Sequence, residues 1–324
     1  MKTVKIGLLG LGNIGTGTYK TLEMNREQIE AAAGRQVEIT KILEKDVDRE
    51  RDITVDPRKF TQDPDVIFDD PEIDIVIELL GGIEPASTFM LRALEKGKHV
   101  VTANKAAVAA NFGRLMKTAR ERGVEFRFEA SVGGGIPILN ALTTVLRANQ
   151  FEEILGILNG TTNYILTQMT ENGLAYEDVL KAAQEKGFAE ADPTADVEGI
   201  DVANKLSILM ALAFDLYVAP EDIPTEGITK ITKADIDSAA ARNCKIKLIA
   251  SAKKVGDQVA YSVKPVEMPV THPLAGINNE FNAVFVKGNA VDELMFYGKG
   301  AGPLPTGSAV MGDVLEIAKI CGRK

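Results

Sequence analysis

The chain has 324 residues, of which 45% are hydrophobic and 26% charged, and its formal net charge is −9. A chain of this length normally divides into two domains, each large enough to bury a core. The negative charge argues against a nucleic-acid-binding protein, because phosphate contacts need clustered basic side chains. No apolar run approaches the roughly 20 residues that span a membrane, so we expect no membrane partner.

The cysteines and histidines narrow the chemistry further. Cys244 and Cys321 lie far apart and lack metal-ligand spacing, which indicates a reducing compartment and predicts a cytoplasmic protein. The first residues enter a predicted strand directly, which leaves no room for a signal peptide. His99 and His272 are the two histidines of the sequence, so we do not expect a histidine-based zinc site or a Ser-His-Asp triad.

The N-terminal segment has the order strand, glycine-rich turn, helix. An apolar run at 4–9 precedes a helical pattern at about 16–33, and the turn between them reads Gly10, Leu11, Gly12, Asn13, Ile14, Gly15. In this dinucleotide-binding pattern the first glycine permits a tight turn, the second lets the backbone approach a pyrophosphate, and the third lets helix and strand pack closely. We therefore expect residues 10–15 to hold a nicotinamide dinucleotide.

Further strands are predicted at 37–43, 65–68, 74–80, 99–101 and 125–129, with a helix at 87–96. This alternation predicts an α/β domain with a doubly wound, Rossmann-type parallel sheet up to about residue 130. The second strand ends in Glu44 and Lys45. An acid there bonds the ribose hydroxyls of NAD, whereas a base accommodates the 2′-phosphate of NADP, so the preference between them stays open.

Two turns of this domain are candidates for chemistry. Thr102 to Lys105 follow a strand at the carboxyl edge of the sheet, where such sheets bind ligands, so Lys105 could face the nicotinamide end of the cofactor. The competing interpretation is a solvated lysine at the start of a surface helix. The glycine run at 133–135 could wrap a phosphate, expose carbonyls to a cation, or form only a tight inter-domain turn.

The second half of the chain has a different pattern. A strand at 152–158 leads into Asn159, Gly160 and Thr161 and a helix at 164–171. The amide of Gly160 and the hydroxyl of Thr161 suit a carboxylate at a helix start, although simple N-capping explains them equally well. Strands at 245–253, 258–266 and 282–287 predict an antiparallel or mixed sheet, hence an α+β domain. A loop at 298–306 and a helix at 308–319 complete the chain.

The most polar stretch of the sequence is 188–205. Five carboxylates fall within twelve residues, 190–201, and we expect Pro193 to keep the segment extended. A buried helix follows at 202–214, on which Asp201 and Lys205 share one face. A substrate with an ammonium group and a reacting carbonyl could use both, although a solvated acidic loop with a surface ion pair is the competing interpretation.

Several blocks together resemble homoserine dehydrogenase: GLLGLGNIG, HVVTANK, FEASVGGGIP, NGTTNYIL, GFAEADPTADVEGIDVANKL, NEFNAV and FYGKGAGPLPT. They occur in the family's order and cover nearly the whole chain. The resemblance implies reversible conversion of L-aspartate 4-semialdehyde and L-homoserine with NAD(P)H. It implies a dinucleotide-binding domain at 1–130, a substrate-binding and dimerisation domain at 131–302, and a helix at 303–324 that returns to the first domain. Many members carry an ACT domain after that helix; we expect that in this chain the domain is either absent or has been cut away.

The resemblance also assigns roles to matching positions. Lys205 and Lys105 match lysines at the reacting centre, and Lys205 is our first choice for the hydroxyl proton. The residues matched around homoserine are Glu190, Asp196, Asp201, Gly160 and Thr161. A monovalent cation such as sodium is matched by Glu129 and the backbone carbonyls of Val132, Gly134 and Ile136. The cofactor contacts would include Lys45, Thr102, Lys105 and Gly302.

Two alternatives remain open on the sequence. A reductase of another aspartate-derived metabolite could share the first domain, but the 188–205 block belongs to the substrate half and argues against it. A non-catalytic dinucleotide-binding regulator would need no paired lysines at the pocket. The expected partners are the small-molecule substrate and a second copy of the chain in a homodimer, without nucleic acid.

Overall fold

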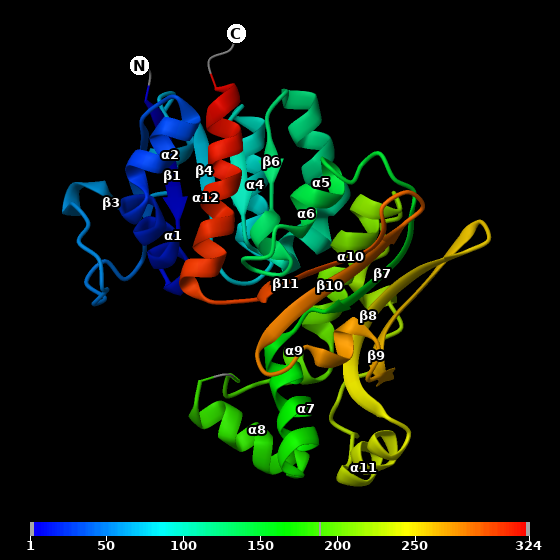
Figure 1. Ribbon diagram of the computed structural model, residues 1–324. Helices are drawn as coiled ribbons and strands as arrows, with labels where there is room; N and C mark the ends of the chain where they lie inside the picture. Colours follow the sequence, from blue (N-terminus) through cyan, green and yellow to red (C-terminus); the bar gives the residue numbers. More distant parts are fainter. Residues whose placement is uncertain (1–2, 188, 322–324) are drawn as a thin grey trace. The chain divides into compact units, whose positions relative to one another are not determined.

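The computed structural model describes residues 3–187 and 189–321. The chain divides into two compact units (Figure 1). The first comprises Met1–Gly135 and Ala301–Lys324, and the second comprises Ile136–Gly300. The boundaries expected from the sequence were 130 and 302. In the described part of the chain, no helix combines the length and apolar content needed to cross a membrane.

The first unit is built on a six-stranded sheet in the order β3-β2-β1-β4-β5-β6. Its strands are β1 (Val4–Leu9), β2 (Val37–Leu43), β3 (Phe60–Thr61), β4 (Ile75–Glu78), β5 (His99–Thr102) and β6 (Phe126–Arg127). Every neighbouring pair is parallel, which confirms the predicted doubly wound sheet. The strand order reverses between β1 and β4, and ligands of such sheets bind at this switch point, beyond the carboxyl ends of the strands.

The helices of the first unit are α1 (Asn13–Met24), α2 (Arg26–Ala33), α3 (Asp65–Phe68), α4 (Ala86–Glu95), α5 (Lys105–Arg122) and α12 (Pro303–Ile320), with 3₁₀ turns at Pro57–Lys59 and Glu129–Ser131. The C-terminal helix α12, red in Figure 1, packs against α1. Gly17 makes this approach possible, because a Cβ there would lie 2.1 Å from the carbonyl oxygen of Pro303. Apolar side chains of α12, such as Val310 and Val314, complete the core under the sheet.

Two expectations for this unit need correction. Residues 65–68 form the short helix α3, not a strand; the side chain of Asp63 accepts a hydrogen bond from the amide of Asp65 (2.9 Å) and starts the turn. Periodicity cannot separate strand from helix in so short an apolar run. The helical stretch expected at 16–33 is two helices that meet at Asn25, whose φ of −120° interrupts the helical backbone.

The second unit contains a five-stranded sheet in the order β11-β10-β7-β8-β9. Its strands are β7 (Phe151–Ile157), β8 (Cys244–Val255), β9 (Gln258–Pro269), β10 (Phe281–Gly288) and β11 (Asp292–Lys299). All neighbouring pairs are antiparallel. Strand β11 was not predicted, and its end was expected to be a loop, because polar residues and Gly298 give this edge strand little apolar signal.

The helices of the second unit are α6 (Ile138–Thr143), α7 (Gly160–Asn172), α8 (Tyr176–Glu185), α9 (Thr194–Val197), α10 (Ile200–Ala213) and α11 (Lys233–Ala241), with 3₁₀ turns at Pro220–Asp222 and Pro273–Gly276. Helices α7 and α10 both pack against β8. Most side chains of α10 are buried, as its continuous apolar sequence predicts. The start of α7 and the first two turns of α10 carry the polar groups that matter for chemistry.

Candidate active site

The glycine turn after β1 has the geometry that a dinucleotide requires. Gly10 has φ +92°, and its amide donates to the carbonyl of Leu43 (2.9 Å) at the end of β2. A Cβ on Gly15 would lie 2.2 Å from the carbonyl oxygen of Gly10, so helix α1 and the turn touch backbone to backbone. At Gly12, the N-cap of α1, a Cβ would meet no described atom within 4 Å. The open side of Gly12 therefore faces the space into which a pyrophosphate fits.

Glu44, at the end of β2, is tied to this turn. Its carboxylate accepts hydrogen bonds from the amides of Leu11 (2.9 Å) and Asp46 (3.1 Å) and pairs with the Arg51 guanidinium at 3.3 Å. Burial opposes ionisation, but the hydrogen bonds from Asp46 and Leu11 and the charge of Arg51 outweigh it and lower the pKa of Glu44. The acid that could have bonded a ribose is thus used to brace the glycine turn.

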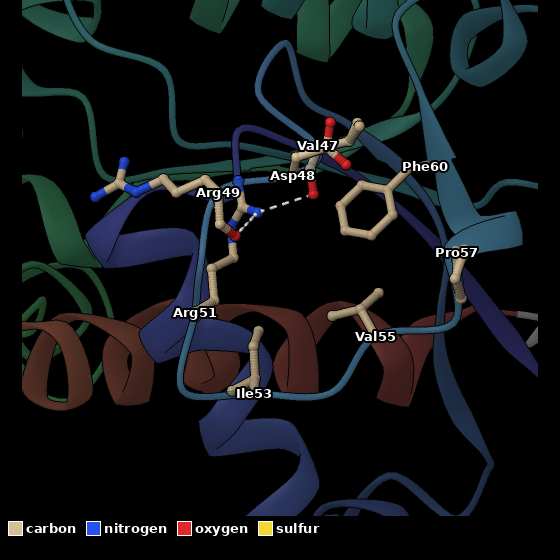
Figure 2. A pocket seen from close by; sticks show the side chains of 8 residues that line it. All are labelled: Val47, Asp48, Arg49, Arg51, Ile53, Val55, Pro57 and Phe60. Carbon is tan, nitrogen blue, oxygen red and sulfur yellow. Dashed lines mark hydrogen bonds between the residues drawn. The ribbon is translucent and has the colours of Figure 1, made fainter.

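A pocket of about 300 Å³ lies beside this brace (Figure 2). Its lining consists of Val47, Asp48, Arg49, Arg51, Ile53, Val55, Pro57 and Phe60. Arg51 donates to the carbonyls of Val47 (3.4 Å) and Arg49 (2.8 Å), the two contacts dashed in Figure 2. Lys45, the expected cofactor contact, is exposed on the adjoining turn and is not among the lining residues. Arg49 and Arg51, which line this pocket, were not predicted as site residues, because they lie in an irregular segment without a recognisable motif.

The carboxyl edge of β4 and β5 carries a second polar group. Glu78, the last residue of β4, is fully buried and accepts hydrogen bonds from the amide of Leu80 (2.7 Å) and the hydroxyl of Thr102 (2.6 Å). The Thr102 oxygen in turn accepts from the amide of Asn104 (3.0 Å), the N-cap of α5. Lys105 follows as the first residue of α5 and is half-buried. Thr102 and Lys105 therefore belong to one hydrogen-bonded turn.

In the second unit, Lys205 is buried on α10, with 8% of its surface exposed. Its Nζ donates to Oδ2 of Asp201 (2.6 Å), one turn earlier, and to the carbonyl of Leu158 (2.7 Å) at the end of β7. The Asp201 side chain is 7% exposed. The pair is a buried ion pair, and the alternative of a solvated surface pair is wrong.

The start of α7 joins this ion pair through Asn159, the N-cap of the helix. Its side-chain nitrogen donates to Asp196 (2.7 Å) and to Asp201 (2.9 Å), while Thr161 donates its hydroxyl to Asp196 (3.1 Å). Four side chains from three separate segments therefore form one network with Lys205. The sequence analysis treated Asn159 only as part of a capping turn. The feature of the sequence that could have pointed to Asn159 is a polar N-cap residue directly before a glycine.

Gly160 opens α7 against another backbone segment. A Cβ at this position would lie 2.8 Å from the carbonyl oxygen of Glu280. The side-chain oxygen of Asn159 meanwhile accepts from the amide of Thr162 (2.9 Å). The capping interpretation of this turn is therefore correct, and it coexists with the network above. The amides of the first helical turn lie at the positive end of the helix dipole, which suits a carboxylate.

The acidic segment before α10 is less extended than expected. Residues 194–197 form the short helix α9, preceded by Pro193, and Asp192 accepts hydrogen bonds from the amide (3.1 Å) and hydroxyl (2.6 Å) of Thr194. Proline is compatible with a helix start, so it begins a helical turn here. Glu190 is exposed, and its carbonyl accepts from Gln184 (3.1 Å). Phe188, at the start of the predicted stretch, lies outside the described residues.

Of the candidate cation ligands, Glu129, Val132 and Gly134 follow β6 in the first unit, and Ile136 is the first residue of the second unit. Glu129 is buried, and its amide donates to the Asp313 carboxylate of α12 (2.8 Å). Gly133 and Gly134 both have positive φ, +73° and +55°, which turns the chain sharply beside Val132. Within the described chain, no three His, Cys, Asp or Glu residues are grouped to hold a metal. One carboxylate with backbone carbonyls is an all-oxygen donor set that fits a hard cation.

Comparison with known proteins decides the family. A model described as "Homoserine dehydrogenase, NAD binding domain" matches residues 10–129, and one described as "Homoserine dehydrogenase" matches residues 137–315. Homoserine dehydrogenase of Bacillus subtilis is 44% identical over 319 residues, covering 98% of this chain and 74% of the relative. This chain belongs to the homoserine dehydrogenase family. Solved structures agree: that of a homoserine dehydrogenase from Thiobacillus denitrificans has a TM-score of 0.96 at 43% identity, covering 99% of this chain and 74% of that one.

A more distant solved structure is also similar over nearly its whole length. A hyperthermophilic archaeal homoserine dehydrogenase in complex with NADPH has a TM-score of 0.81 at 25% identity and covers 97% of both chains. The chain spans about three quarters of the curated relatives it matches.

The protein is therefore an NAD(P)-dependent oxidoreductase that interconverts L-homoserine and L-aspartate 4-semialdehyde. Its first unit contains an NAD-binding domain. The substrate half matches the same family as the cofactor half, which sets aside a reductase that shares the first domain alone and a non-catalytic regulator.

Proposed function

We propose that Lys205 exchanges the hydroxyl proton of homoserine during homoserine dehydrogenase catalysis. The observation that carries this proposal is the buried bond between Lys205 and Asp201, tied to the start of α7 through Asn159. An ammonium group has three donors, and Asp201 and the Leu158 carbonyl use two of them. The third can meet the substrate oxygen at which the proton is gained or lost. The bound nicotinamide cofactor supplies the hydride chemistry.

The neighbouring groups suit the amino-acid end of the substrate. The amides at the start of α7, with Gly160 and Thr161, can hold its carboxylate at the positive end of the helix. Asp196 and the exposed carboxylate of Glu190 can hold its ammonium group. The family resemblance likewise implies Gly160 and Thr161 beside the carboxylate, and Glu190 and Asp196 among the acidic residues around homoserine. Lys105, in the first unit, is the second candidate for the proton, since its turn lies at the ligand-binding edge of the parallel sheet.

For the cofactor, we propose that NADP is preferred over NAD. Glu44 is committed to Leu11, Asp46 and Arg51, so its charge is already compensated and repels a 2′-phosphate less than a lone acid would. Lys45 and Arg49 are exposed on the same turn and can pair with that phosphate. A related homoserine dehydrogenase is described in complex with NADPH.

We also propose that Glu129, with the carbonyls of Val132, Gly134 and Ile136, holds a monovalent cation such as sodium. Glu129 is anchored by Asp313, and a bound cation would neutralise its buried carboxylate. Adding sodium should therefore raise the melting temperature of the wild type, and Glu129→Ala should abolish that response. A wild-type melting temperature that is indifferent to sodium, relative to a choline control, would exclude the site.

The assembly and location are further proposals. We propose a homodimer formed through the second unit, as the family resemblance implies, and a cytoplasmic location, with which the two widely separated cysteines of the sequence are consistent. Sedimentation velocity tests the dimer directly. A monomer at concentrations that support full activity would contradict it.

The central assay follows the absorbance of the reduced nicotinamide with homoserine and either cofactor. Lys205→Ala should lower kcat by roughly 10²–10⁴, the usual range for loss of a general acid–base group, and leave cofactor affinity nearly unchanged. Lys233→Ala is the matched control, because Lys233 is an exposed lysine of the same unit. A folded Lys205→Ala protein with near-normal kcat would transfer the role to Lys105.

A further inference from the structure

The buried carboxyl of Glu78 is used by none of the steps above. It lies in the middle of the parallel sheet, where register pairs Glu78 with Leu9 of β1 on one side and with Thr102 of β5 on the other. Its surface is fully inaccessible. A charged group in such a place is costly unless it is well compensated, so its presence needs a reason beyond packing.

Glu78 connects the two loops that leave the ligand-binding edge. It accepts from Leu80 in the loop after β4 and from Thr102, the last residue of β5, from which the second loop leaves. Asn104 adds a direct link between the loops, because its side-chain nitrogen donates to the carbonyls of Leu80 (3.2 Å) and Gly82 (2.7 Å). Glu78 therefore lies directly beneath the turn that ends in Lys105.

This position is under the nicotinamide half of the cofactor site proposed above, on which the inference rests. The glycine turn after β1 takes the pyrophosphate, and the end of β2 takes the adenosine ribose. The other half of a dinucleotide extends beyond the carboxyl ends of β4 and β5 in a sheet of this order. Glu78, Thr102 and Lys105 all stand at those two strand ends.

The donors to Glu78 are neutral groups, so none of them supplies a positive charge that would compensate an ionised carboxylate. Burial raises the pKa of Glu78 to about 7, against hydrogen bonds from Thr102, Leu80 and Asn104 that lower it. A positive charge arriving close by would favour the ionised form. The nicotinamide ring carries such a charge when it is oxidised and is neutral when it is reduced.

We propose that Glu78 is a specificity-determining residue that favours the oxidised over the reduced cofactor by placing a buried negative charge beneath the nicotinamide ring. The other ionisable groups on the flanking strands and at the first residue of α5 are Lys5 of β1, His99 of β5 and Lys105. Lys5 and His99 stand toward the amino ends of their strands. All three are also present in a Glu78 variant, so they do not account for a change in the NADP⁺/NADPH ratio when Glu78 is replaced.

The test compares dissociation constants of NADP⁺ and NADPH at mildly alkaline pH, where the carboxyl is ionised. Glu78→Gln keeps the shape and removes the charge, so it should weaken NADP⁺ about tenfold relative to NADPH, the equivalent of roughly one pKa unit of coupling. Glu78→Asp should keep much of the wild-type ratio. Thr102→Val removes a hydrogen bond that favours the ionised carboxyl, so it should shift the ratio in the same direction as Glu78→Gln but by less. An unchanged ratio in folded Glu78→Gln would overturn the proposal.

A second measurement needs no variant and so remains decisive if Glu78→Gln does not fold. Near pH 7 about half of the Glu78 carboxyls are protonated, so NADP⁺ binding should release up to about half a proton, and NADPH binding less. Calorimetry in buffers of different ionisation enthalpy measures this difference, and the 2′-phosphate contributes equally to both. Equal proton release would refute the inference. Failure of both cofactors to bind would instead refute the cofactor site itself.

Discussion

Replacing Lys205 should cost stability as well as activity, and the two losses can be separated. In the wild type, the ammonium group lies 2.6 Å from the buried Asp201 carboxylate. Lys205→Met removes that charge and leaves Asp201 with a side chain that is 7% exposed and with the neutral Asn159 donor. Breaking a buried ion pair by removing one partner typically costs about 3–5 kcal/mol. For a unit of this size, that corresponds to a fall in melting temperature of roughly 6–20 °C.

The double variant Lys205→Met/Asp201→Asn removes both charges and should recover most of the lost stability, because no buried charge remains uncompensated. Its kcat should stay as low as that of Lys205→Met, since the proton-exchanging group is still absent. Urea unfolding followed by circular dichroism gives the stabilities, and the cofactor absorbance assay gives kcat.

Two outcomes would refute this reasoning. If Lys205→Met loses less than about 1 kcal/mol, the ion pair does not carry the expected buried charge. If the double variant regains activity, the defect of the single variant is structural, and Lys205 does not exchange the proton. The exposed pair Lys233–Asp237 supplies the control, because breaking a surface pair by Lys233→Met should cost at most about 0.5 kcal/mol.

Three further predictions concern other parts of the molecule. Lys45→Ala should weaken NADP more than NAD, because only NADP carries a 2′-phosphate; equal losses in titrations with both cofactors would remove Lys45 from the ribose site. Glu190→Ala should mainly raise KM for homoserine, as expected for binding shared by ground and transition states, and a selective fall in kcat would contradict that role. Burial lowers the pKa of Lys247 from 10.5 to about 8. Between these values the unfolded chain holds a proton that the folded one lacks, so stability should rise with pH by about 3 kcal/mol. In Lys247→Met, pH-dependent urea unfolding should show no such rise.

Local patterns in the sequence were sufficient for much of the fold. The glycine turn at 10–15 and the strands at β1, β2 and β5 were predicted close to their observed bounds, because each depends on neighbours along the chain. Periodicity likewise identified the buried helix α10 and the shared face of Asp201 and Lys205. The prediction for residues 65–68 was wrong, because the run is too short for its pattern to be distinctive. The edge strand β11 was not predicted, because its sequence is too polar.

The tertiary structure decided which polar groups act together. Thr102 reaches Glu78 across 24 positions, and Asn159 reaches Asp201 across 42. No local pattern records such pairs, because a hydrogen bond depends on where two distant segments are brought by packing. The same holds for Glu44, for which the sequence left a ribose contact open and which the structure shows bonded to the Leu11 amide and paired with Arg51. The sequence therefore determined the elements and the chemical repertoire, and folding determined the partners, since burial makes each polar group depend on the few atoms that it can reach.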